Sequence, residues 1–271
     1  DSFKIAIKNI KKFHEKQFPE NYEIENMDTK LQSVWKPIDS VGLYIPGGNA
    51  IYPSSLIMSV VPAQIAGVKR IVCVTPPTHN LNSYIAFLLE ELGVTEVYQV
   101  GGAQAIAALA FGTNIIQPVN KIFGPGNAYV ASAKKQVFGK VGIDLVAGPS
   151  EIIVVADESN NPEWVASDIM AQAEHDENAQ CILITNSEAY ADKVLDKIEN
   201  LKNSVRKKET IEKSLRIHGL IIIIDDLKSS YKIINKIGPE HLHLQSTERE
   251  VILQKVNNAG GIFLGDYSTE A

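Results

Sequence analysis

The chain has 271 residues, 45% of them hydrophobic and 21% charged, which is the composition of an ordinary globular protein. Its net charge of −6, without a lysine- and arginine-rich stripe, argues against a nucleic-acid partner. The longest apolar runs have the length of strands, so neither a membrane span nor a signal peptide is expected. Cys73 and Cys181 lie in buried-strand patterns, and we expect inert core thiols in a reducing, cytoplasmic compartment.

Predicted strands and helices alternate through the first half of the chain, and glycine or proline stands at nearly every junction. After an opening helix over 3–13, the expected strands are 41–46, 70–75, 96–100, 121–123, 144–146 and 151–156. The expected helices between them are 53–66, 81–92, 103–111 and 128–138. The strands are apolar on both faces, as parallel strands covered by helices must be, so a doubly wound parallel sheet is predicted.

A second alternating series surrounds and follows the polar turn at 159–162. Its expected helices are 163–177, 188–202, 208–215, 227–237 and 248–257. Its expected strands are 181–185, 220–224, 241–245 and 262–264, and strand 151–156 could already belong to it. We therefore predict an α/β protein with two doubly wound parallel-sheet layers.

Four glycine-containing turns follow predicted strands and carry polar side chains, which are Tyr44, Gln104, Asn127 and Ser150. The carboxyl ends of parallel strands line one crevice of an open sheet, and ligands bind there. Each glycine could instead serve only to reverse the chain. Four such turns at one edge favour a ligand site.

The 124–127 turn, Gly-Pro-Gly-Asn, follows a strand and opens a helix, whose free N–H groups could face a phosphate. It carries the first two glycines of a dinucleotide fingerprint, but Tyr129 stands where the third small residue belongs. Asp144 has the spacing of a ribose-binding acid, yet it is predicted to begin a strand, and we reject that role. A plain glycine-rich turn remains the alternative interpretation.

Gln172 and His175 are three residues apart in the predicted helix 163–177, which would place both on one face. Imidazole is a common zinc ligand, and an amide oxygen can complete a metal shell. Two ligands cannot hold a zinc ion, which needs three or four. The pair is therefore half of a metal site or simply one polar helix face.

Glu240 and His241 begin a predicted strand directly after a rigid Gly-Pro turn. A histidine there can act as a general base near neutral pH, and a neighbouring carboxylate can activate water. His241 and His243 share one strand face, opposite two leucines. A solvated polar face of the strand is the alternative.

Taken together, these segments closely resemble the histidinol dehydrogenase family, in the family's order and across nearly the whole chain. The matching segments are 41–48, 100–112, 121–127, 147–151, 172–175 and 238–242. The resemblance implies two successive NAD-dependent oxidations of L-histidinol, through histidinaldehyde, to L-histidine. It also implies a zinc ion that grips the imidazole and amine of the substrate, two incomplete Rossmann-like domains, and an intertwined homodimer.

The resemblance also implies roles for individual residues. The zinc ligands would be Gln172 and His175, and both would contact the substrate together with Ser150 and His241. Glu240 would activate the water that hydrates the aldehyde, and His241 would be the general base. Tyr44, Gln104 and Asn127 would line the NAD site.

The implied domain division places the zinc and catalytic residues in a first domain, residues 1–40 and 152–271, and the NAD side in an inserted domain, residues 41–151. The family's other zinc ligands follow position 271, so we expect a truncated chain with two of four ligands. Two alternatives stay open, a catalytically incomplete α/β module that binds a small ligand and another NAD-dependent alcohol or aldehyde dehydrogenase. Neither cysteine has a base nearby in sequence, which argues against thiol-based aldehyde oxidation.

Overall fold

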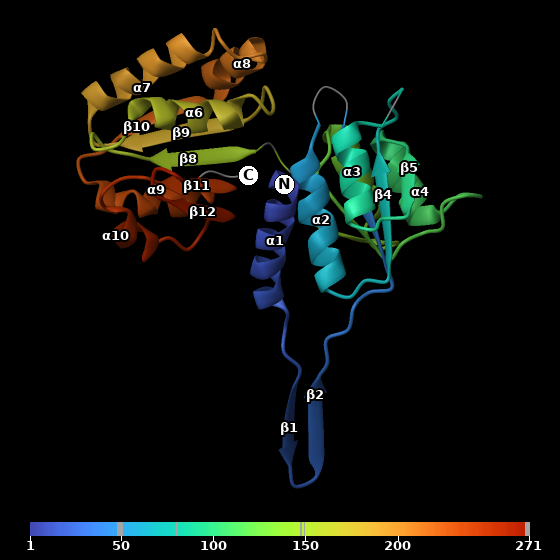
Figure 1. The fold of residues 1–271 in the computed structure, drawn as a ribbon. Helices are drawn as coiled ribbons and strands as arrows, with labels where there is room; N and C mark the ends of the chain where they lie inside the picture. Colours follow the sequence, from blue (N-terminus) through green and yellow to red (C-terminus); the bar gives the residue numbers. More distant parts are fainter. Residues whose placement is uncertain (48–50, 80, 147, 149, 269–271) are drawn as a thin grey trace. The chain divides into compact units, whose positions relative to one another are not determined.

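The computed structural model describes residues 1–47, 51–79, 81–146, 148 and 150–268. The chain divides into two compact units, residues 1–147 and 148–271. Each unit has one five-stranded parallel sheet with helices on both faces (Figure 1). The predicted α/β class with two parallel sheets is confirmed.

The sheet of the first unit has the strand order β5-β4-β3-β6-β7. Its strands are β3 (Ser40–Tyr44), β4 (Arg70–Thr75), β5 (Glu96–Gln99), β6 (Lys121–Phe123) and β7 (Gly142–Ile143). The helices of this unit are α1 (Ser2–His14), α2 (Pro53–Ile65), α3 (Ser83–Glu91), α4 (Gly102–Phe111) and α5 (Ala128–Val137), and the short helix η1 (Glu15–Gln17) follows α1. The chain therefore reverses direction across the sheet between β3 and β6, which is the switch point where such sheets bind ligands.

Two apolar layers hold this sheet between its helices. Val41 and Leu43 of β3 pack with Leu56 of α2 and Leu88 of α3 on one face. The other face packs against α4 and α5, and Gly42 leaves the room that Leu109 of α4 fills. A Cβ at Gly42 would lie 2.8 Å from a methyl of Leu109. The missing side chain at Gly42 therefore lets α4 pack close to the sheet.

The opening helix α1 packs in the first unit. Its apolar residues Phe3, Ala6, Ile7 and Ile10 lie against the core formed by α2 and α3. This packing differs from the implied division, in which residues 1–40 join the zinc-bearing domain. The other implied boundary, at 151/152, lies within a few residues of the observed one at 147/148. The assignment of residues 1–40 in the whole protein stays a prediction.

A two-stranded hairpin, β1 (Tyr22–Asn26) and β2 (Thr29–Ser33), follows η1 and was not predicted. Ile24 pairs with Leu31 in an antiparallel register, and both side chains are more than half exposed. Figure 1 shows the hairpin extending away from the helices of its own unit. An isolated hairpin is marginally stable in water, so this one presents an apolar face that lacks a cover within the described part of the first unit.

The second unit repeats the same strand order, β10-β9-β8-β11-β12. Its strands are β8 (Glu151–Val155), β9 (Gln180–Thr185), β10 (Gly219–Ile223), β11 (His241–Leu244) and β12 (Gly261–Leu264). Its helices are α6 (Pro162–Ala173), α7 (Glu188–Leu201), α8 (Lys208–His218), α9 (Tyr231–Ile237) and α10 (Arg249–Leu253), with the short helix η2 (Leu227–Ser229) before α9. Helices α6, α7 and α8 cover one face, and η2, α9 and α10 cover the other.

Two predicted element bounds are wrong in ways that affect the site. Helix α6 ends at Ala173 because Asp176 turns the chain, and its carboxylate accepts a bond from the N–H of Asn178 at 2.8 Å. Strand β7 is Gly142–Ile143, so Asp144 follows the strand and does not begin it. Among the described residues, none of the helices is long and apolar enough to cross a membrane.

Candidate active site

Five of the predicted site residues lie at the amino edge of the sheet in the second unit. Ser150 directly precedes β8, and its carbonyl accepts a bond from the N–H of Gln180 at 3.0 Å. Helix α6 runs back across the sheet, so its last turn brings Gln172 and then His175 to the same edge. Glu240 and His241 stand at the start of β11. Ser150 therefore does not share an edge with the other three strand-end turns, and that part of the prediction is wrong.

Gln172 and His241 are in direct contact. Oε1 of Gln172 lies 3.1 Å from Nδ1 of His241, and Gln172 is only 2% exposed. A carbonyl oxygen can only accept, so the Nδ1 atom carries the proton in this bond. In a neutral imidazole the Nε2 atom then bears the lone pair that a general base requires. The contact therefore sets both the orientation and the tautomer of His241.

Glu240 stands beside the Nε2 side of His241. Its Oε1 atom lies 3.8 Å from Nε2 of His241, and its side chain is 53% exposed. The backbone of Glu240 is fixed, because its carbonyl accepts the N–H of Gly261 at 2.8 Å. A Cβ at Gly260 would meet the same carbonyl at 2.7 Å, so the glycine permits this close approach. The carboxylate can reach solvent and can also stabilise a protonated His241.

A second polar contact between α6 and β11 was missed by the sequence analysis. Asp168 lies one helical turn before Gln172, and its Oδ2 atom is 3.1 Å from Nδ1 of His243. The same oxygen accepts a bond from Nε2 of Gln245 at 2.5 Å. His243 is 1% exposed, so the solvated-face alternative is wrong for this residue. The i, i+4 pair on the helix and the i, i+2 pair on the strand were the available signal.

His175 does not lie on a helix face shared with Gln172. It is exposed in the turn after α6, where its N–H donates to the carbonyl of Gln172 at 3.1 Å. Over the described ranges, no group of three or more His, Cys, Asp or Glu side chains is placed to hold a metal. The amide oxygen and the imidazole fit a zinc shell in chemistry, and they would provide two of its ligands.

The three other predicted residues lie at the carboxyl edge of the sheet in the first unit. Tyr44 ends β3, Gln104 lies in the first turn of α4 after β5, and Asn127 follows β6. The hydroxyl of Tyr44 accepts the N–H of Gly102 at 3.1 Å, which joins two of the strand-end turns. Tyr44 is 4% exposed, whereas Gln104 is exposed. The edge therefore offers one anchored and one accessible polar side chain near the switch point.

Asn127 caps helix α5. Its Oδ1 atom accepts the N–H groups of Tyr129 and Val130 at 3.1 and 3.2 Å. These bonds satisfy two of the free N–H groups at the helix start, and they leave the amide nitrogen of Asn127 for another partner. Asn127 therefore has a structural role as the cap of α5, as in a plain glycine-rich turn. This role still allows its Nδ2 atom to contact a polar ligand.

Asp144 is the residue whose prediction changes most. It directly follows β7, at the carboxyl end of the strand, where a ribose-binding acid of a dinucleotide fold would stand. The reason given for rejecting that role is therefore wrong. The carboxylate nevertheless turns inward, because Oδ2 accepts the N–H of Gly124 at 2.9 Å and Oδ1 accepts the N–H of Leu145 at 2.7 Å.

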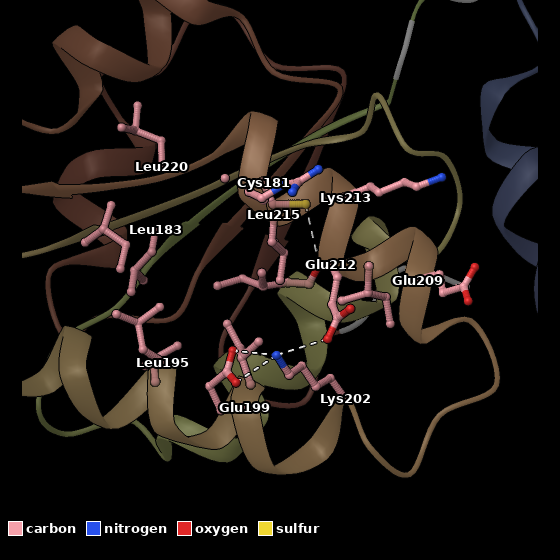
Figure 2. A pocket seen from close by; sticks show the side chains of 17 residues that line it. Cys181, Leu183, Leu195, Glu199, Lys202, Glu209, Glu212, Lys213, Leu215 and Leu220 are labelled. Carbon is pink, nitrogen blue, oxygen red and sulfur yellow. Dashed lines mark hydrogen bonds and ion pairs between the residues drawn. The ribbon is translucent and has the colours of Figure 1, made fainter.

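A pocket of the second unit lies away from these residues. A cavity of about 650 Å³ opens between α7, α8 and the strands β9 and β10. Figure 2 shows its floor at Cys181 and Leu183 and its charged rim, where Lys202 bonds to Glu199 and Glu212. None of the eight predicted site residues lines it. Its surface is an apolar floor with paired charges, and no catalytic group follows from it.

The carboxyl edge of the second unit is acidic. A hollow of about 590 Å³ there is lined by five carboxylates and one lysine, which are Asp157, Glu158, Asp225, Asp226, Glu248 and Lys228. The lysine pairs with Glu248 at 3.6 Å. The two sheets have the same strand order, yet their carboxyl edges carry different chemistry.

Two helix-covered parallel sheets, each with a switch point, define a doubly wound α/β protein of the Rossmann-like kind. A family model for histidinol dehydrogenase matches residues 1–271. The chain belongs to the histidinol dehydrogenase family.

Individual relatives agree with this assignment. The histidinol dehydrogenase of Brucella suis biovar 1 is 47% identical over 272 residues, which cover 100% of this chain and 63% of that protein. The crystal structure of histidinol dehydrogenase from Elizabethkingia anophelis matches with a TM-score of 0.93 at 38% identity, over 98% of this chain and 62% of that one. A substrate-bound Staphylococcus aureus AldH matches over 96% of this chain and 71% of its own, with a TM-score of 0.52 at 15% identity. That last likeness shows the fold alone.

Proposed function

We propose that the whole protein oxidises L-histidinol through histidinaldehyde to L-histidine, with NAD as oxidant and zinc as the metal. The observation that carries the proposal is the meeting of Ser150, Gln172, His175, Glu240 and His241 at one sheet edge, although they come from three separate segments of the chain. The chain spans 63% of the length of the Brucella relative, so the activity is proposed for the protein that contains it.

The overall reaction converts an alcohol, one water and two NAD⁺ into a carboxylate, two NADH and three protons. Bound NAD supplies the hydride acceptor, and bound zinc supplies a Lewis-acid grip on the substrate's imidazole and amine. In the first oxidation, Nε2 of His241 takes the proton of the substrate's hydroxyl group as a hydride leaves the carbon that bears this hydroxyl. The Gln172 contact keeps Nδ1 protonated, so that Nε2 is the basic atom.

The second oxidation needs a water at the aldehyde carbon. Glu240 has an exposed carboxylate that can take a proton from that water, and the C–O bond forms as His241 returns the proton of the first step to the carbonyl oxygen, which gives the hydrate and restores the basic Nε2 atom. His241 then takes the hydroxyl proton of the hydrate while the second hydride leaves. Oε1 of Glu240 lies 3.8 Å from Nε2 of His241. This separation suits a base and a separate water-activating group, because the carboxylate of Glu240 stabilises His241 when His241 holds a proton.

Residues for both groups are present in the two units. Tyr44, Gln104 and Asn127 would hold NAD at the edge of the first sheet, where the switch point lies. Gln172 and His175 would hold zinc through an amide oxygen and an imidazole. Ser150 would bind the substrate together with both zinc ligands and His241.

The thiols do not support a cysteine-based aldehyde dehydrogenase. Burial raises the pKa of Cys73 to about 12, so this group is a thiol and not a nucleophilic thiolate. Cys181 is 2% exposed and donates to the carbonyl of Ile169 at 3.6 Å. Both cysteines are unbridged, which agrees with a reducing compartment such as the cytoplasm.

A homodimer is also part of the proposal. Its support is the exposed apolar face of the β1–β2 hairpin, with Tyr22, Ile24 and Leu31 each more than half exposed. Exposed apolar patches of this kind mark surfaces that other chains cover.

The test is a steady-state assay of the whole protein with L-histidinol, NAD and a metal-free preparation reloaded with zinc. We expect two NADH for each histidine formed, and a loss of turnover when zinc is removed. Absence of NADH formation under these conditions would contradict the proposal. Tight NAD binding without any turnover would instead favour the ligand-binding module.

A further inference from the structure

An ion pair between a buried lysine and a partly buried aspartate lies beside the 124–127 turn. Lys134 of α5 is 4% exposed, and its ammonium group pairs with the carboxylate of Asp144. The same Nζ atom donates to the carbonyl of Gly124 at 3.0 Å, while Oδ2 of Asp144 accepts the N–H of Gly124 at 2.9 Å. The pair therefore binds both backbone groups of one residue.

Gly124 is held from the opposite side as well. Its φ angle is +119°, and a Cβ there would lie 2.1 Å from the carbonyl oxygen of Tyr44. Tyr44 is itself tied to the next turn through its hydroxyl and the N–H of Gly102. The ion pair thus fixes a chain of contacts that joins the ends of β3 and β6 and the start of α4.

The carboxylate of Asp144 is committed mainly to this arrangement. It accepts two backbone N–H groups and pairs with a lysine, so both of its oxygens already have partners inside the protein. The N–H of Gly124 is occupied too, and it cannot donate to a pyrophosphate as the first N–H groups of a dinucleotide turn do. A residue at the ribose position has become an internal support.

Simple stabilisation is a weak explanation for the pair. Replacing a buried ion pair with apolar residues of similar volume is often neutral or stabilising, because removing two charges from water is costly. What apolar residues cannot replace is the pair of directed bonds on the N–H and carbonyl of Gly124. Geometry at the turn is the property that depends on both partners.

We propose that Lys134 and Asp144 are positioning residues that clamp Gly124 and so hold Asn127 and Tyr44 in the arrangement that binds the dinucleotide. This inference rests on the proposed use of NAD at this edge. In this inference the pair does not contact the cofactor. Loss of the pair is expected to weaken the affinity for NAD more than the affinity for histidinol.

The experiment compares four variants of the whole protein, which are Lys134→Met, Asp144→Asn, the double variant of both, and Lys135→Met as the control. Lys135 is the exposed neighbour on the same helix, so its substitution removes the same charge without touching the turn. Each single variant leaves one partner without its counter-charge and is expected to lower Tm. The double variant removes both charges and keeps the experiment informative if the single variants fold poorly.

Four properties are measured, which are Tm, the affinity for NAD, the KM for histidinol and hydrogen exchange. We expect the double variant to keep a Tm near that of the control, to raise the KM and Kd for NAD at least tenfold, and to leave the KM for histidinol within twofold. Hydrogen exchange of the 120–130 segment should also be faster than in the control, because the N–H of Gly124 exchanges a charged carboxylate acceptor for a weaker neutral amide oxygen and its carbonyl loses the ammonium donor. A double variant with unchanged NAD affinity and unchanged exchange would overturn the inference.

The remaining outcomes are also decisive. Equal losses for NAD and histidinol would assign the pair a general structural role and reject the positioning role. Faster exchange with unchanged NAD affinity would show a clamp that does not serve the cofactor, which also rejects the proposal. The same measurements are made on the unaltered protein. If that protein neither binds nor reduces NAD, the proposed function itself is contradicted, and this result is distinct from a failure of the inference about the ion pair.

Discussion

Nδ1 of His241 bonds to Oε1 of Gln172 at 3.1 Å, which joins the first residue of β11 to the last turn of α6. The residue proposed as the base is therefore oriented by a residue proposed as a zinc ligand. One buried amide would fix the tautomer of the base and complete part of the metal shell. Loss of this amide should affect metal affinity and proton transfer together.

Gln172→Ala is expected to lower zinc affinity and kcat by at least about 10- to 100-fold each, the range for losing a group that only supports a metal ligand. The reason is that both His241 and the metal lose the same oxygen. Zinc titration and steady-state assays of the whole protein measure the two effects. Ser167→Ala on the exposed face of α6 is the control, and a selective loss of only one property would contradict the shared role.

Glu240→Gln should separate the two oxidations. The glutamine cannot take a proton from water, so hydration of the aldehyde slows by about 10²- to 10⁴-fold while alcohol oxidation continues. The expected result is close to one NADH per histidinol consumed, with the aldehyde trapped by a carbonyl reagent. His241→Asn is expected to slow both steps. A Glu240→Gln variant that still forms two NADH per substrate would disprove the assignment.

Gly124→Ala is expected to destabilise the protein more strongly than Gly139→Ala. Both glycines have positive φ angles, +119° and +96°, so both alanines carry backbone strain. A Cβ at Gly124 meets Tyr44 at 2.1 Å, whereas nothing lies within 4 Å at Gly139. We expect about 1 kcal/mol for the Gly139 variant and at least about 2 kcal/mol more for the other. Similar midpoints in urea unfolding would reject the close contact.

The stability contributed by Asp157 should depend on pH. Burial alone would raise its pKa, but donors from Ser159 and Thr247 outweigh burial and lower the pKa below its usual value. A carboxyl with a lowered folded pKa stabilises the protein above its unfolded pKa of about 4, and this contribution is lost as the pH falls through the folded value.

Thr247→Val removes the hydroxyl that donates to Asp157 at 2.9 Å. At pH 7 we expect a loss of about 1.5 to 3 kcal/mol, the range for hydrogen bonds to charged groups. The loss should shrink as the pH falls below about 4, the unfolded pKa, and through the lower folded pKa of Asp157. Urea midpoints across pH measure it, and Thr247→Ser should restore stability. A loss that is equal at pH 7 and pH 3 would point to packing.

The hairpin face predicts an effect on assembly. Ile24→Ser with Leu31→Ser removes the apolar pair and should shift the whole protein from dimer to monomer in light scattering. Glu25→Ser with Lys30→Ser changes a paired position on the opposite face and is expected to leave the mass unchanged. A dimer that survives the apolar substitutions would remove the hairpin from the interface.

The sequence predicted both sheets because apolar runs and glycine turns are local signals. It missed the β1–β2 hairpin, although Tyr22, Ile24 and Leu31 alternate with polar residues, since an alternating face without a visible partner resembles an exposed loop. The end of α6 was placed too late because Asp176 stops the helix through a side-chain bond. Periodicity does not register such a bond.

The candidate site residues were predicted one by one, and their arrangement in space was not. The resemblance identified Gln172 and His241, and their contact agrees with roles at one site. The Asp168–His243 contact was missed, because an acid on a helix is usually solvated and its partner lies 75 residues away. Asp144 was misjudged because strand β7 ends one residue before it, and its ion pair with Lys134 forms only when α5 packs on the sheet.

The acidic hollow at the carboxyl edge of the second sheet has a consequence for stoichiometry. A pyrophosphate placed there would meet five carboxylates and one lysine already paired with Glu248. Like charges at such short range repel strongly in a partly enclosed site. Identical strand order in the two sheets therefore does not imply two nucleotide sites, and the NAD site proposed at the first sheet would have no counterpart at this edge.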